Sequence, residues 1–197
     1  MNFYRRKLLN AILYLVKERK KLRRSTPLTA LAKLLCEFDF RHFKETGEPA
    51  IGLRYFAYPN GPLPFEFWLE VNDGRVPDDF KSKLNITITR DEIDQSQRTV
   101  EFLAVSDPDM GVFSPRESRI LTTILEIYGK ATTRELVDAS HERGSPWDKT
   151  KKSKGDKKEI DYIAGLDGVS TLTSEEAQEA LDEFFAVIKN FRLSPTN

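Results

Sequence analysis

Three helix-start signals limit how this chain can fold. In each, a serine or threonine stands three residues before a glutamate: Ser114 before Glu117, Thr132 before Glu135 and Thr173 before Glu176. This spacing is a capping box, in which the hydroxyl and the carboxylate each accept a hydrogen bond from a free backbone N–H of the first turn. The sequence therefore predicts helices that begin at these three points.

Two further helices are predicted near the N-terminus. The first has one apolar stripe at helical spacing, made by Tyr4, Leu8, Ile12, Leu15 and Val16. The second is expected to begin with Thr26 as N-cap and Pro27 at the first helical position, where a missing N–H costs nothing. Gly47 can end this second helix in the left-handed conformation.

The middle of the chain has the pattern of β-structure. Residues 84–89 alternate apolar and polar and are rich in β-branched side chains, and residues 99–105 form a second apolar run. Residues 53–58 are a third candidate strand, stopped by the turn residues 59–62, and a short aromatic helix is expected over 64–71. The predicted fold class is α+β: a mainly helical single domain over residues 1–197, with a small antiparallel β-sheet.

Charge is unevenly spread although the formal net charge is zero. A basic N-terminal helix is expected at about residues 3–24, and a basic, mobile loop at about residues 145–158. Such blocks are either nucleic-acid contacts or solvated faces, and a neutral domain attracts phosphate poorly. A nucleic-acid-binding regulator that uses the N-terminal helix is therefore the alternative function, with weak binding of nucleic acid expected at most.

Catalytic and metal-binding chemistry has little support in the sequence. The chain has one cysteine, Cys36, and two histidines, His42 and His141, and it has no phosphate-binding or dinucleotide-binding glycine loop. Asp39 and His42 share a helical face. They are either a polar pair for binding or catalysis, or a histidine held by the carboxylate or by the following loop. We expect no metal, no cofactor and no enzymatic activity; an enzyme using Asp39, His42 and His141 remains the third hypothesis.

The expected location is cytoplasmic. A lone cysteine suits a reducing compartment, and no signal sequence or stretch of roughly 20 apolar residues appears.

An aromatic cluster is the most informative anomaly. Between residues 55 and 68 the chain places six aromatic side chains around a proline–glycine turn. Strand alternation can bury only one of Tyr55 and Phe56, so some aromatic surface is either left for a partner or covered by the N-terminal helix or the sheet. The candidate partner-binding residues are Arg54, Tyr55, Tyr58, Phe65 and Trp68.

The same region resembles the Panacea domain of SocA-like antitoxins. The likeness lies in the order and spacing of several short motifs from about Leu28 to Trp147. They are Lys33-Leu34-Leu35 with Phe38, Asp39 and His42; Gly47, Gly52, Tyr55 and Ala57; Gly61-Pro62-Leu63-Pro64; Phe113-Ser114 with Glu117 and Leu121; Tyr128-Gly129; Thr132, Glu135 and Leu136; and Ser140-His141 with Pro146-Trp147. The family-motif residues singled out are Asp39, His42, Gly61, Pro62, His141 and Trp147.

The resemblance implies an antitoxin of a toxin–antitoxin system. Members, which include the phage-associated GepA-like proteins, are thought to bind a protein toxin directly, and at least one delivers its toxin to a protease as an adaptor. The expected partner is thus a cognate toxin, with a protease as a further route and a role in phage defence. This chain departs from the pattern in its longer basic N-terminal helix, its lysine-rich segment over 149–158, and Leu63 in place of the usual valine.

Overall fold

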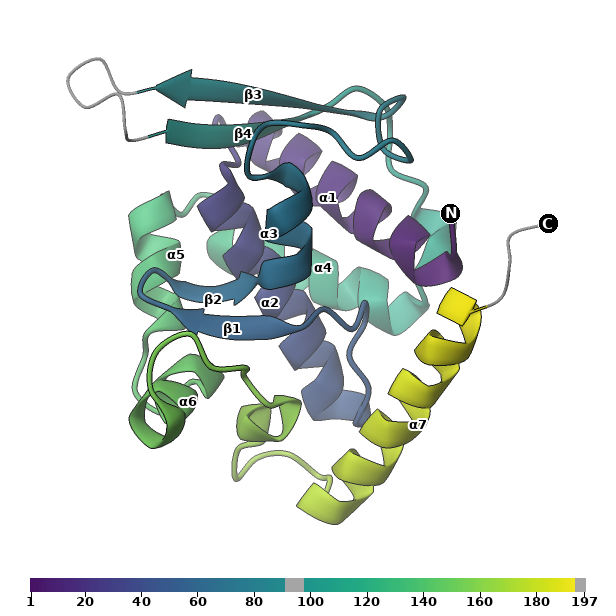
Figure 1. Cartoon of the computed structure of the whole chain (residues 1–197), viewed down its shortest axis with the longest axis vertical. Helices are drawn as coiled ribbons and strands as arrows, with labels where there is room; N and C mark the ends of the chain where they lie inside the picture. Colours follow the sequence, from purple (N-terminus) through teal and green to yellow (C-terminus); the bar gives the residue numbers. More distant parts are fainter. Residues whose placement is uncertain (91–97, 194–197) are drawn as a thin grey trace.

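The computed structural model describes residues 1–90 and 98–193. Within these residues seven α-helices, two 3-10 helices and four strands follow one another (Figure 1). In chain order they are α1 (Phe3–Lys21), α2 (Leu28–Thr46), β1 (Tyr55–Tyr58), β2 (Gly61–Pro64), α3 (Phe65–Val71), β3 (Leu84–Arg90), β4 (Arg98–Ala104), η1 (Met110–Val112), α4 (Pro115–Tyr128), α5 (Thr133–Ser140), α6 (Pro146–Lys154), η2 (Tyr162–Gly165) and α7 (Ser174–Leu193). The fold is mainly helical α+β, as predicted.

Helix α2 is the centre of the molecule. It contacts α1, α4, α5, α7, β2, β4 and η2, so it is covered on almost every side (Figure 1). Its apolar residues, including Leu31, Leu35 and Phe38, are fully buried. A helix that is apolar around most of its circumference belongs in a core. Its end at Gly47 is as predicted, because Gly47 has a φ of 77° and donates its N–H to the carbonyl of Phe43.

The start of α2 differs from the prediction. Pro27, not Thr26, occupies the N-cap position, and the Thr26 hydroxyl is buried without a hydrogen-bond partner among the described residues. Residues 26 and 27 are extended and pair with β4: the Thr26 carbonyl accepts the N–H of Phe102 at 3.3 Å, and Pro27 bridges Glu101. A residue before proline favours extended backbone, and here that conformation serves the strand.

The β-structure consists of two separate antiparallel hairpins. Strand β3 pairs with β4 from Leu84 opposite Ala104 to Arg90 opposite Arg98, which confirms the predicted strands; the loop over 91–97 lies outside the described residues. Strand β1 pairs with β2, with Tyr58 opposite Gly61. The turn is therefore Pro59-Asn60 alone, and Gly61 and Pro62 belong to the second strand of the hairpin.

The prediction of a mobile loop over residues 145–158 is wrong for most of that segment, because most of it is helical. Residues 146–154 form helix α6, whose N-cap Ser145 accepts the N–H of Asp148 and whose first residue is Pro146. The lysine content pointed to a solvated loop, yet the start Ser-Pro-x-Asp is the same kind of signal as that of α4. After α6 the chain lies along β1, where Ala57 exchanges backbone hydrogen bonds with residues 157 and 158.

The basic N-terminal helix is α1, and several of its cations have internal partners. Buried Arg19 donates to the backbone carbonyls of Tyr128 at 3.0 Å and Ala131 at 3.0 Å. Buried Lys7 pairs with Glu117, and Arg5 pairs with Glu70 and Asp79. These residues attach α1 to α3, α4 and the segments that flank them. The positive charges of Arg5, Lys7 and Arg19 therefore stabilise the packing of α1.

The capping box of α4 gives a stability prediction. The Ser114 hydroxyl accepts the Glu117 N–H at 3.2 Å, and the Glu117 carboxylate accepts the Ser114 N–H at 2.7 Å. We expect Ser114→Ala to lower the free energy of unfolding by about 1 kcal/mol, because one N–H at the helix start loses its partner. Chemical denaturation measures this change. Ser118→Ala, inside the same helix, is the matched control and should have a smaller effect; equal effects would contradict the capping role.

Candidate protein-binding surface

A buried carboxylate organises the segment that leads into β1. Asp39, on α2, is fully buried and accepts hydrogen bonds from three consecutive backbone N–H groups: Ile51 at 2.6 Å, Gly52 at 3.2 Å and Leu53 at 3.1 Å. The hydroxyls of Tyr55 and Tyr162 donate to it at 3.0 and 3.2 Å. Burial raises the pKa of Asp39, against the opposing effect of these donors. The carboxylate thus joins α2, the 51–53 turn, β1 and η2.

His42 holds the same segment from its other end. Its Nδ1 lies 2.7 Å from the Glu48 carbonyl, and the Thr46 hydroxyl lies beside it. Of the interpretations left open by the sequence, the histidine held by the following loop is the one found, and no Asp39–His42 hydrogen bond forms among the described residues. Both motif side chains are therefore committed to shaping residues 47–53.

A second set of contacts anchors the β1–β2 hairpin at its tip. The Lys33 ammonium donates to the Pro62 carbonyl at 2.9 Å, and the Trp147 indole donates to the Tyr58 carbonyl at 2.8 Å. The rings of His141 and Trp147 stack with centroids 3.8 Å apart. Gly61 has a φ of 91°, and a Cβ there would lie 2.4 Å from the Ser140 hydroxyl, so only glycine fits. The motif residues from distant parts of the chain thus meet around one hairpin.

Four aromatic rings pack together on the outer side of this hairpin and α3, three of them stacked and the fourth, Phe56, edge-on to Phe65. We call Phe56, Tyr58, Phe65 and Trp68 the aromatic ladder. Phe65 is its centre, with ring centroids 5.7 Å from Phe56, 6.1 Å from Tyr58 and 5.8 Å from Trp68. All four side chains are partly exposed. Three of the five predicted partner-binding residues, Tyr58, Phe65 and Trp68, therefore lie together at the surface.

Tyr55 does not belong to this surface, which corrects the sequence interpretation. It is 1% exposed, its hydroxyl is bonded to Asp39, and it packs on Phe40 and Tyr162. Alternation along β1 turns Tyr55 and Ala57 inward and Phe56 and Tyr58 outward. Phe56 is thus the partly exposed residue missing from the predicted partner-binding set, although the alternation of side chains along a strand already indicated it.

Arg54 is exposed but already paired. Its guanidinium forms two hydrogen bonds with Glu159, at 2.8 and 2.6 Å, and one with Glu66 at 3.1 Å. The Glu159 carboxylate raises the pKa of Arg54, and Arg54 lowers that of Glu159. Arg54 therefore fastens α3 to the segment after α6 at the edge of the ladder, and any partner would meet it as part of an ion-pair network.

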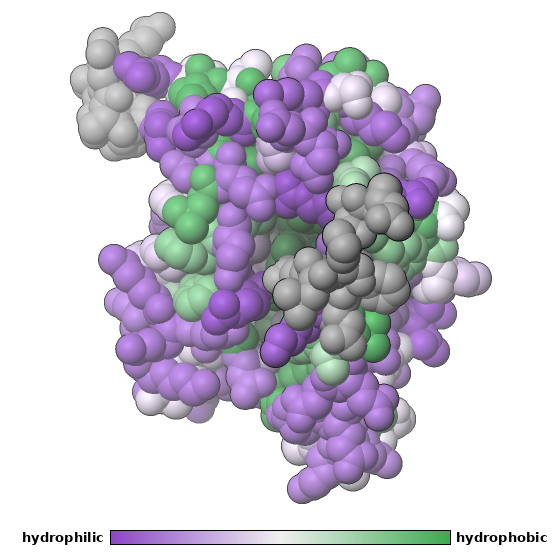
Figure 2. Space-filling view, turned by 45° about the vertical axis from the view of Figure 1, so that its right-hand side comes forward, coloured by the Kyte–Doolittle hydropathy of each residue, from purple (hydrophilic) through white to green (hydrophobic). Residues whose placement is uncertain are grey.

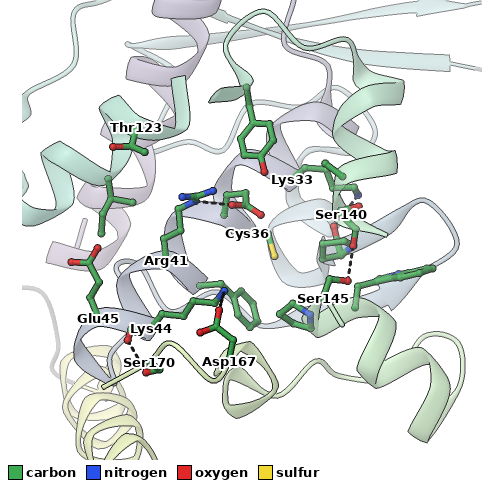
Figure 3. A pocket seen from close by; sticks show the side chains of 18 of the residues that line it. Lys33, Cys36, Arg41, Lys44, Glu45, Thr123, Ser140, Ser145, Asp167 and Ser170 are labelled. Carbon is green, nitrogen blue, oxygen red and sulfur yellow. Dashed lines mark hydrogen bonds and ion pairs between the residues drawn. The ribbon is translucent and has the colours of Figure 1, made fainter. Parts of the chain in front are cut away.

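A groove of about 620 Å³ lies beside the hairpin anchors, and Lys33 is one of its lining residues (Figure 3). Its floor is α2, and its walls come from α4, α5, the start of α6 and residues 160–171. Pro62 and Trp147, two of the family-motif residues, line it.

Two features are absent from residues 1–90 and 98–193. No group of three or more His, Cys, Asp or Glu side chains is placed to hold a metal ion. No helix there has both the length and the apolar character needed to cross a bilayer. On the face shown in Figure 2, hydrophilic residues predominate, and the lower projection of the molecule is mostly hydrophilic.

The Asp39 network gives a second prediction. Asp39→Asn keeps the shape of the side chain but turns an NH₂ group toward backbone N–H donors. We expect the free energy of unfolding to fall by about 2–3 kcal/mol, because hydrogen bonds to a buried charge are lost. Thermal and urea unfolding measure this loss. The matched control is Asp138→Asn on the exposed face of α5, which should be nearly neutral; comparable losses in both variants would contradict the role of Asp39.

Comparison with known families agrees with this architecture. Residues 31–148, more than half of the chain, match the family model described as antitoxin SocA-like, Panacea domain. Comparisons with curated proteins and with solved structures gave no match. The matched segment holds Asp39, the β1–β2 hairpin, the aromatic ladder and the His141–Trp147 stack, whereas Tyr162 and α7 follow it. The chain therefore belongs to the SocA-like antitoxin family and carries its Panacea domain.

Proposed function

We propose that this protein is an antitoxin that neutralises a cognate protein toxin by binding it directly, with the aromatic ladder as part of the contact surface. The observation that carries the proposal is the ladder itself: four packed, partly exposed rings on α3 and on a hairpin that Lys33 and Trp147 hold in place. Partly exposed aromatic side chains are enriched at the energetic centres of protein interfaces.

Rigidity supports this choice of surface. Stacking restricts the rings, and the bonds to Pro62 and Tyr58 hold the backbone beneath them. Side chains that are already ordered lose less conformational entropy on binding, so more of the contact energy appears as affinity. Tyrosine and tryptophan also combine a large apolar area with a polar atom, which suits a surface that is wet when free and buried when bound.

The ladder is too small to be the whole interface. A specific complex buries roughly 800 Å² on each partner. The surface continues from Trp68 into a depression of about 400 Å³, which Trp68 itself lines. Its other lining residues are Pro27, Leu28, Thr29, Asn72, Arg98, Thr99, Val100 and Thr133. We therefore place the interface across α3 and the start of α2.

Binding without catalysis is also part of the proposal. The polar residues considered for catalysis have structural partners: Asp39 holds the 51–53 turn, His42 holds the Glu48 carbonyl, and His141 stacks on Trp147. A cytoplasmic location and delivery of the toxin to a protease remain further proposals, and the toxin's half-life with and without this protein measures the latter.

The nucleic-acid alternative is not proposed. Several cations of α1 that would contact phosphate are bound internally, including Arg5, Lys7 and Arg19.

The protein encoded by the adjacent open reading frame is the first candidate for the toxin.

The interface prediction is tested with Tyr58→Ala and Trp68→Ala. Each should weaken toxin binding by about 30-fold, equivalent to about 2 kcal/mol, and reduce rescue of growth from the toxin. Isothermal titration gives the affinity, and circular dichroism with thermal melting verifies that each variant folds. Ile127→Ala, an exposed apolar residue of α4, is the matched control and should bind normally. Folded Tyr58→Ala and Trp68→Ala variants that bind and rescue like the unaltered protein would place the interface elsewhere.

A further inference from the structure

Lys33 is a buried cation without a countercharge. The residue is 3% exposed, and its ammonium donates to one carbonyl, that of Pro62. Among the described residues no carboxylate lies within ion-pair distance of it. Buried charges are normally paired, because removal from water is costly. Burial lowers the pKa of Lys33 to about 8, so the amine is still mostly charged at neutral pH.

The described groups around Lys33 also provide no negative charge to balance its ammonium. Nε2 of His141 is buried without a hydrogen-bond partner among the described residues. The pKa of His141 is lowered by burial and then by the positive charges of Lys33 and Lys151, with a smaller opposing effect from Asp138. The Ser140 hydroxyl stands beside Lys33, at the space that Gly61 leaves open. The Lys33 ammonium, the Ser140 hydroxyl and the His141 ring thus lie near one another at one point.

This point is one end of the groove. Figure 3 places Lys33, Cys36, Ser140 and Ser145 toward one end and Glu45 and Thr123 toward the other. The other cations in the groove have acidic partners: Arg41 pairs with Glu37, Lys44 with Asp167, and both Arg116 and Arg119 with Glu45. Of the five cations that line the groove, Lys33 is therefore the one not neutralised within the described part of the chain.

The groove has the size and lining of a small-molecule site. Its volume of about 620 Å³ falls within the usual range of roughly 300–1,000 Å³. Its lining mixes polar and charged side chains with the apolar side chains of Phe40, Ile120, Leu136, Trp147 and Ile160. A ring or short alkyl body would fit against them, with an anionic group at the Lys33 end.

We propose that this groove binds a small organic anion whose carboxylate or phosphate group pairs with the Lys33 ammonium beside Ser140, and whose apolar body lies on Phe40, Trp147 and Ile160. The ligand would supply the countercharge that the described chain does not. The site is separate from the aromatic ladder, so the inference goes beyond the proposed toxin binding and does not depend on it.

The first test uses 1-anilinonaphthalene-8-sulfonate, an aromatic anion that fluoresces when bound in apolar surroundings, on the full-length protein. We expect one bound molecule per chain, with affinity reduced about tenfold or more by Lys33→Met through loss of the ion pair. The uncharged N-phenyl-1-naphthylamine should bind both proteins alike. Lys130→Met, at an exposed position in the turn after α4, is the matched control and should change neither affinity.

The second test needs no variant and therefore stands even when Lys33→Met does not fold. Affinity for the sulfonate dye should fall as the pH rises through about 8, because Lys33 loses its proton while the sulfonate stays charged. Two titratable neighbours, the Cys36 thiol and the His141 imidazole, do not titrate there. Burial raises the pKa of the Cys36 thiol well above 9.0, and the pKa of His141 lies below 6.5. The uncharged dye should show no such pH dependence.

Displacement of the dye identifies the anionic group. Benzoate and phenyl phosphate represent the two chemistries, with benzamide as the uncharged control. Displacement by either anion but not by benzamide supports the proposal and names the preferred group. Equal dye affinity in a folded Lys33→Met variant, affinity independent of pH between 7 and 9, or displacement by toxin but by neither anion would overturn it.

Discussion

The buried Asp39 carboxylate is the interaction on which the rest of the structure depends. Its two oxygens collect three backbone N–H groups and two tyrosine hydroxyls from segments up to 123 residues away. A buried carboxylate is tolerable only when its acceptor capacity is filled, so the surrounding backbone has little freedom to take another path. The direction in which the chain enters β1, and hence which aromatic residues face outward, follows from this network.

Two anchors with different chemistry hold the hairpin that carries the aromatic ladder. At its base the Asp39 network fixes residues 51–55, and at its tip Lys33 and Trp147 bind carbonyls of β2 and β1. The first anchor draws Tyr162 from beyond the segment that matches the family model, so the C-terminal part of this chain completes the Panacea core. The same lysine that steadies the hairpin also faces the groove, which places the two candidate binding surfaces on opposite sides of one small element.

The role of a charged residue in this protein depends on whether its side chain is buried or exposed. The N-terminal helix has many basic residues, and the sequence alone leaves solvation or nucleic-acid binding as their uses. The structure instead places Arg19 against backbone carbonyls, with its pKa lowered by burial, and places Lys7 against the carboxylate that also caps α4. A cation packed between helices contributes to attachment of those helices and is no longer available to phosphate.

The sequence by itself determined the local features of this protein. The starts of α4, α5 and α7, the end of α2 at Gly47 and the alternating strand β3 follow from interactions between residues at most a few positions apart, and the motif order indicated the family. The start of helix α6 has the same kind of signal, an N-cap Ser145 followed by Pro146, but the lysine-rich sequence after it suggested a loop. Only the tertiary structure decided that the Tyr55 side chain is buried and that of Phe56 partly exposed. It also decided that the Asp39 carboxylate accepts hydrogen bonds from residues 51–53 and forms none with His42. Finally, it decided that Lys33 is buried without a carboxylate partner among the described residues. Each of these depends on which distant segment arrives at the site. The spacing of residues along the chain does not predict these contacts between distant segments, because they form only when the helices pack and exclude water.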